Sequence, residues 1–119
     1  RVKLVYIMDL INSIQKRPLM YVQEEKIDYI AHLLMGYCIA ASHNNATSEM
    51  DKNFWAWFGY WLDDWMKVNY SNSYEVKTLY WHEILKDITD DEREAVELFY
   101  RLCKQFFKDY EQKNGYFNW

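Results

Sequence analysis

The stretch FWAWFGYWLDDWM, residues 54–66, decides the fold because it is long, strongly aromatic and apolar at helical spacing. Intervals of three and four residues place its large side chains on one face of a helix expected at about residues 50–68. A helix that is apolar over so much of its circumference is typical of the centre of a bundle, packed by several neighbours. Its tryptophans are therefore expected mainly in the core. The predicted buried stripe consists of Phe54, Phe58, Trp61, Trp65 and Val68, widened by Trp55 and Leu62.

Apolar residues at the same spacing predict four more helices, at about residues 3–15, 27–41, 75–88 and from Thr89 to about 112. Pro18 disfavours helical geometry at Arg17 and ends the first of them. The apolar residues 19–21 that follow are expected to pack back against the bundle. Thr89 and Glu92 have the spacing of a capping box at the start of the last helix. The predicted buried face of the second helix consists of Ile27, Ile30, Ala31, Leu34, Cys38 and Ala41.

The composition supports one helical domain. The 119 residues are 50% hydrophobic and 19% aromatic, with only three Gly and one Pro, too few breakers for a turn-rich β domain. The predicted fold class is therefore all-α, a single-domain bundle of about five helices over residues 1–119. Gly36 costs about 1 kcal/mol in a helix interior relative to Ala, which suggests that another backbone approaches closely there.

Charge and apolar runs narrow the class of partner. The formal net charge of −4 disfavours binding to nucleic acid, whose affinity comes mainly from Lys and Arg, and suits a basic protein partner. The most apolar run, residues 30–41, is too short to cross a membrane. With no secretory signal at the start, the sequence predicts a soluble cytoplasmic protein. Cys38 and Cys103 are interpreted as buried free thiols, with a disulfide between them as the alternative.

Motifs for catalysis or metal binding are weak. His32, His43 and His82 lie in three segments without the spacing of a zinc-binding helix, and the glycines are isolated. Asp63 and Asp64 are neighbours on a helix, so their side chains diverge and cannot share a proton. The sequence therefore predicts no catalytic residue, no metal and no cofactor, and a protein that is not an enzyme.

Carboxylates gather just before and within the start of the last helix. Five acidic residues and one arginine lie between Asp87 and Glu94, a local excess of four negative charges that equals the excess of the whole chain. Attraction to the positive end of the helix dipole accounts for two or three of them. The cluster is either a solvated helix start or a surface that steers and binds a basic partner.

The sequences SIQKRPLMYV, residues 13–22, and IDYIAHLLMGYCIA, residues 27–40, resemble a broad group of small bacterial immunity proteins. In that group an Arg-Pro-x-Met-Tyr element precedes a helix with a Gly-Tyr pair near its end. Residues 54–66, the segment around Trp81 and TDDEREAVELFYRLCKQFF, residues 89–107, are similar to the group's later helices. Val22 and Gln23 stand where the group commonly has Gly.

This resemblance implies an immunity partner of contact-dependent growth inhibition or another polymorphic toxin system. Such a protein binds the C-terminal domain of a cognate toxin, often a nuclease with a basic surface, and blocks its active site or substrate path. The motif residues are assigned to the scaffold: Arg17, Pro18, Met20, Tyr21, Gly36, Tyr37 and Ala95.

The residues expected to bind the partner are instead acidic or aromatic: Asp63, Asp64, Tyr70, Tyr74, Asp87, Asp90, Asp91 and Glu92. The alternative hypothesis is a helical small-molecule-binding module with an aromatic pocket.

Overall fold

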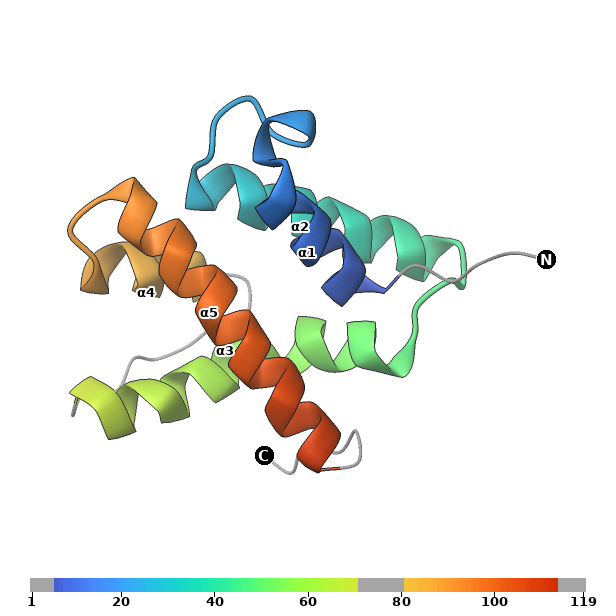
Figure 1. Ribbon diagram of the computed structural model, residues 1–119. Coiled ribbons are helices and arrows are strands. Elements are labelled where there is room, and N and C mark those ends of the chain that lie inside the picture. Colours follow the sequence, from blue (N-terminus) through green and yellow to red (C-terminus); the bar gives the residue numbers. More distant parts are fainter. Residues whose placement is uncertain (1–5, 71–80, 114–119) are drawn as a thin grey trace.

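The computed structural model describes residues 6–70 and 81–113 of the chain. These residues form five α-helices and one short 3-10 helix, with no strand among them, so the predicted all-α, single-domain bundle is confirmed (Figure 1). The elements are α1 (Ile7–Lys16), η1 (Pro18–Met20), α2 (Ile27–His43), α3 (Glu49–Tyr70), α4 (Trp81–Ile88) and α5 (Glu92–Gln112). The predicted fourth helix began at residue 75, and its first six residues lie outside the described ranges, as does the C-terminal tail.

The helix at the centre of the bundle is α5, because it contacts all four other α-helices. It runs diagonally across the bundle over the middle of α3 (Figure 1). The aromatic helix α3, expected at the centre, packs against α1, α4 and α5. α5 is buried on more than one face, since Leu98, Tyr100, Leu102 and Phe107 are buried along with Val96, Phe99, Cys103 and Phe106.

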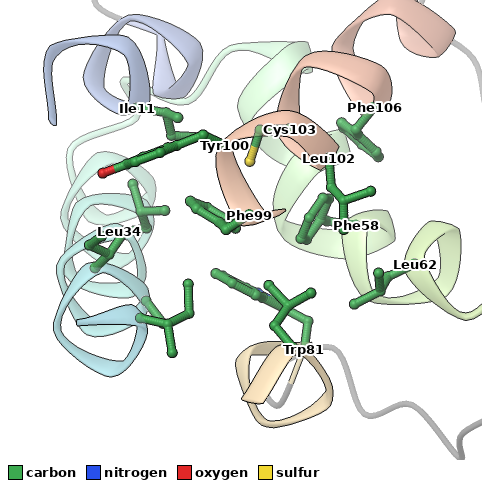
Figure 2. Close-up of a cluster of buried hydrophobic side chains, with 14 of the residues drawn as sticks. Ile11, Leu34, Phe58, Leu62, Trp81, Phe99, Tyr100, Leu102, Cys103 and Phe106 are labelled. Carbon is green, nitrogen blue, oxygen red and sulfur yellow. The ribbon is translucent and has the colours of Figure 1, made fainter. Parts of the chain in front are cut away.

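Aromatic side chains join α3, α4 and α5 around Phe58, which is fully buried (Figure 2). Its ring centroid lies 5.2 Å from that of Trp81, 6.0 Å from that of Phe99 and 5.5 Å from that of Phe106. Trp81 and Phe99 stack on each other at 4.8 Å. Pairs at these separations add about 0.5–1.5 kcal/mol each beyond the burial of apolar area. The core is thus an aromatic cluster shared by three helices.

Most of the predicted stripe of α3 is buried, but Trp55, which was expected to widen it, is 37% exposed, and the C-terminal end of the stripe is not buried either. Val68 is 84% exposed and Trp65 is half-buried, while Met66, which was not predicted, is fully buried. Val68 therefore has the spacing of a core residue but lies outside the core cluster of the described residues. The predicted buried face of α2 is confirmed in full.

The segment after Pro18 does not pack into the bundle as expected. Leu19 is 72% exposed, Met20 69% and Tyr21 41%, so the assignment of Met20 and Tyr21 to the scaffold is wrong. Pro18 begins a single 3-10 turn, and the Val22 N–H donates to its carbonyl oxygen at 3.0 Å. Because Val22 takes the position against the core, the three residues between it and Pro18 face outward.

The N-terminus of α5 is not capped by the residues that the sequence predicted. Asp91 is the N-cap and its Oδ1 accepts a hydrogen bond from the Glu94 N–H at 2.9 Å. The Thr89 hydroxyl donates back to the Leu85 carbonyl at the end of α4, so the predicted Thr89–Glu92 capping box is wrong. Glu92 Oε2 instead accepts the Ile27 N–H at 3.2 Å and caps α2.

No close backbone approach occurs at Gly36 within the described residues. The glycine is exposed on α2, and a Cβ added there would meet nothing within 4 Å. Its assignment to close packing is therefore wrong. Ala95, assigned to the same role, is 1% exposed and does lie in the core.

Asp51, which the sequence did not single out, is a buried carboxylate that ties three helices together. It is 1% exposed and lies in the first turn of α3. Its Oδ1 accepts the Ile7 N–H at the start of α1 at 2.8 Å, and its Oδ2 accepts the Tyr37 hydroxyl of α2 at 2.9 Å. Burial and this hydrogen bond raise the pKa of Tyr37.

Cys38 and Cys103 are free and buried, as the favoured interpretation predicted. Burial raises the pKa of Cys38 to about 12 and raises that of Cys103 as well, so both remain thiols near neutral pH. Among the described helices, none is both long and apolar enough to cross a membrane.

Candidate protein-docking surface

One end of the molecule, where α2 and α5 begin and α4 ends, is strongly acidic. We call it the acidic end. The hydrogen bond from Ile27 to Glu92 brings the start of α2 beside the start of α5, and Lys86 links α4 to Asp28 of α2. The acidic end consists of residues 24–28 and 83–94, whose cations are Lys26, Lys86 and Arg93. Its nine carboxylates are Glu24, Glu25, Asp28, Glu83, Asp87, Asp90, Asp91, Glu92 and Glu94.

The charge of the acidic end exceeds that of the whole protein. Nine carboxylates and three cations leave six negative charges, against −4 for the chain, so the remaining residues carry a net positive formal charge. The sequence revealed only the part between Asp87 and Glu94. Glu24 and Glu25 are far from this stretch in the sequence, and only the folded chain brings the start of α2 beside α5.

Four of the predicted partner-binding residues, Asp87, Asp90, Asp91 and Glu92, lie together and exposed at this end. Two of the four also support the fold, since Asp91 caps α5 and Glu92 caps α2. Asp87 and Asp90 are therefore the better positions for testing recognition by charge.

The other predicted binding residues lie elsewhere. Asp63 and Asp64 are on α3, where Lys67 Nζ lies 3.3 Å and 3.8 Å from their carboxylate oxygens. Tyr70 ends α3, is 45% exposed and packs its ring against Trp65 at 5.6 Å. In Figure 1 this end of α3 lies apart from the turn between α4 and α5. Tyr74 lies outside the described residues.

Exposed apolar and aromatic side chains lie close to the acidic end along the chain. Leu19, Met20 and Tyr21, which were expected to pack against the bundle, precede Glu24 by a few residues. Tyr29, in the first turn of α2, is 41% exposed. Lys26 Nζ lies 5.8 Å from the centroid of the Tyr29 ring. Apolar and aromatic anchors beside charged groups are the usual composition of a protein interface.

Beside the acidic end, His82 of α4 is 6% exposed and faces two carboxylates. Its Nε2 lies 3.5 Å from Glu83 Oε1 and 3.9 Å from Asp28 Oδ1. Burial lowers the pKa of His82, and the attraction of these carboxylates opposes that shift. Lys86 Nζ lies 3.0 Å from Asp28 Oδ2 and 3.2 Å from Glu83 Oε1, and its hydrogen bonds to them raise the pKa of Lys86.

A separate groove lies between the C-terminal half of α2 and the first half of α3. It has a volume of about 410 Å³, within the range of small-molecule sites. Ile39 and Trp55 form its apolar walls, while Ser42, His43 and Lys52 supply polar groups. Trp61 and Trp81, by contrast, are buried in the core.

None of the protein-family models, curated proteins or solved structures compared with this chain matches it.

Proposed function

We propose that this protein is an immunity protein that binds a basic toxin domain through the acidic end and blocks its active site or substrate path in the cytoplasm. The observation that carries the proposal is the concentration of nine carboxylates at one end of the fold, from two stretches far apart in the sequence, residues 24–28 and 83–94. The Arg-Pro-x-Met-Tyr element and the likeness of the later helices to immunity proteins supply the class of partner.

Charged and apolar side chains would contribute to different steps of recognition. A negative surface speeds the encounter with a basic domain and disfavours acidic partners. Where the partner is a nuclease, carboxylates would occupy positions that substrate phosphates otherwise take. The exposed Leu19, Met20 and Tyr21 would then add short-range contact, which governs the rate of dissociation more than the rate of association. This action requires no catalytic residue and no cofactor.

The first experiment is to co-express this chain with the C-terminal domain encoded by the gene immediately upstream, and to measure co-purification and protection of cells. The proposal expects a stoichiometric complex and survival of cells that express the toxin domain. Failure to bind that domain and failure to protect would together overturn the proposal.

Charge reversal tests the surface. The variant Asp87→Lys with Asp90→Lys should slow association with the toxin domain at least about tenfold at low salt, and less at 0.5 M NaCl, because screening weakens steering. The control, Glu49→Lys with Glu111→Lys, changes the net charge equally at exposed positions outside the acidic end. Equal effects of the two variants would show that net charge matters and the acidic end does not.

The alternative, a small-molecule-binding module, draws on the groove beside Trp55. It expects a saturable change in tryptophan fluorescence on titration with an amphipathic aromatic probe such as anilinonaphthalene sulfonate. The change should be lost in Trp55→Phe and kept in Trp57→Phe. A response that both variants retain would exclude this groove as the site.

A further inference from the structure

We propose that Asp28, His82 and Glu83 form a binding site for a divalent transition-metal ion of the zinc class. One ligand atom from each of the three residues lies within 4.8 Å of the other two. Asp28 comes from the first turn of α2, and the other two come from the first turn of α4, so the ion would bridge two packed helices. This inference does not depend on the proposed toxin partner.

The spacing of the donor atoms suits such an ion. Zinc binds imidazole nitrogen and carboxylate oxygen at about 2.0–2.2 Å, which separates neighbouring donors in a tetrahedral site by about 3.2–3.6 Å. His82 Nε2 lies 3.5 Å from Glu83 Oε1 and 3.9 Å from Asp28 Oδ1. Both separations are at or beyond the outer limit of a hydrogen bond and close to the separation of two ligands on one ion.

An unsatisfied carboxylate oxygen provides a second, independent indication. Asp28 Oδ1, the oxygen that faces Nε2 of His82, is buried and has no hydrogen-bond partner within the described structure. The imidazole of His82 is itself more than nine-tenths buried. A buried polar atom that lacks a partner destabilises the folded state. A cation between Oδ1 and Nε2 would satisfy the carboxylate oxygen and bind the imidazole in the neutral form that burial favours.

Two neighbouring side chains would tune the site. His32 follows Asp28 by four residues on the same helix, and its ring packs edge-on against that of His82 at 5.9 Å between centroids, which holds the His82 ring in place. Lys86 competes with the ion, because its ammonium already lies between Asp28 Oδ2 and Glu83 Oε1. Removing that ammonium should therefore strengthen metal binding, whereas it should break a site whose only role is an ion-pair network.

The test is isothermal titration of the full chain, freed of metal with EDTA and dialysed, with ZnCl₂ at pH 7.5. The wild type should bind one equivalent. His82→Gln should bind at least about tenfold more weakly, and Lys86→Met at least about threefold more tightly. The matched control is His43→Gln, which changes an exposed histidine at the end of α2 and should leave the affinity unchanged.

Cobalt provides a readout of geometry, since tetrahedral Co²⁺ with nitrogen and oxygen ligands absorbs visible light more strongly than hydrated Co²⁺. The proposal expects this band in the wild type and its loss in His82→Gln. If circular dichroism shows His82→Gln to be unfolded, Asp28→Asn replaces it, with the same expected loss. The proposal is overturned if neither the wild type nor Lys86→Met binds ZnCl₂ at 0.1 mM, or if binding survives both ligand substitutions.

Discussion

Asp51 shows how a single buried carboxylate can fix the position of a helix that begins far away in the sequence. The Ile7 N–H is one of the amides at the start of α1 that have no partner within the helix. Asp51 Oδ1 accepts it from 44 residues away, while Oδ2 accepts the Tyr37 hydroxyl. One side chain thereby connects the start of α1, the middle of α2 and the first turn of α3.

Asp51→Ala should lower the free energy of unfolding by about 2–4 kcal/mol, because it leaves the donors on Ile7 and Tyr37 without their acceptor. Urea denaturation followed by circular dichroism measures the loss. Glu49→Ala is the matched control, since Glu49 is an exposed acid in the same first turn, and it should change stability by less than about 0.5 kcal/mol. Similar losses in both variants would mean that first-turn charge, and not the buried contacts, stabilises α3.

His82 should make the fold sensitive to mild acid. Burial lowers its pKa in the folded state, so the unfolded chain takes up the proton first as the pH falls below about 6.5. Above that pH the imidazole is neutral in both the folded and the unfolded state, so His82 no longer makes the free energy of unfolding depend on pH. The free energy of unfolding should therefore fall between pH 7 and pH 5.5, and it should fall less steeply in His82→Gln.

The measurement is the urea midpoint at several pH values in buffers containing EDTA. His43→Gln serves as the comparison, because this histidine is exposed and should leave the pH dependence as in the wild type. If the urea midpoint of His82→Gln depends on pH as steeply as that of the wild type, groups other than His82 cause the acid sensitivity.

At the scale of the element, α2 is a helix whose buried face is well packed but whose exposed face is not optimised for helix stability. Its six predicted core residues are all buried, while Gly36 on the exposed side has open space around it. Its first turn is capped from another helix by Glu92. The stability of α2 therefore comes from its packing and its cap, and the glycine only weakens it.

Gly36→Ala should raise the free energy of unfolding by about 0.5–1 kcal/mol, because Ala restricts the unfolded backbone and no atom obstructs the new methyl group. Thermal and urea denaturation measure the gain. Ala40→Gly, at another exposed position of α2, should produce a loss of similar size. A destabilised Gly36→Ala protein would show that a backbone does approach Gly36 in solution.

At the scale of the whole molecule, the helices and most of the core were predictable because each helix carries an apolar stripe of regular period. The burial of Asp51 could not be predicted, because its partner on α1 lies 44 residues away and is a backbone amide, which has no sequence signature. The extent of the acidic end was only half visible for the same reason. The period of apolar residues shows which face of a helix is buried. It does not show which helix N-termini lie beside one another in the folded protein.

The exposure of Leu19 and Met20 was mispredicted because apolar character alone was taken to imply burial. Since both lie outside the core, Leu19→Ser with Met20→Ser should change the free energy of unfolding by less than about 1 kcal/mol in total. The same variant should speed dissociation of the toxin domain, as biolayer interferometry would record. Val68→Ser, an equally exposed site on α3, is the control for both measurements.

A large loss of stability in the Leu19 and Met20 variant would instead place this turn in the core. Unchanged dissociation, with a stable fold, would remove the turn from the proposed interface and leave recognition to the acidic end.

Because the 3-10 turn faces outward, its side chains can be selected for partner recognition independently of the core, which is selected for folding. Residues 19–21 are exposed, so substitutions there can accumulate without unfolding the chain. Related proteins could therefore change these few side chains to match an altered toxin while they keep the same aromatic core. Diversification would be concentrated at residues 19–21 and slow around Phe58.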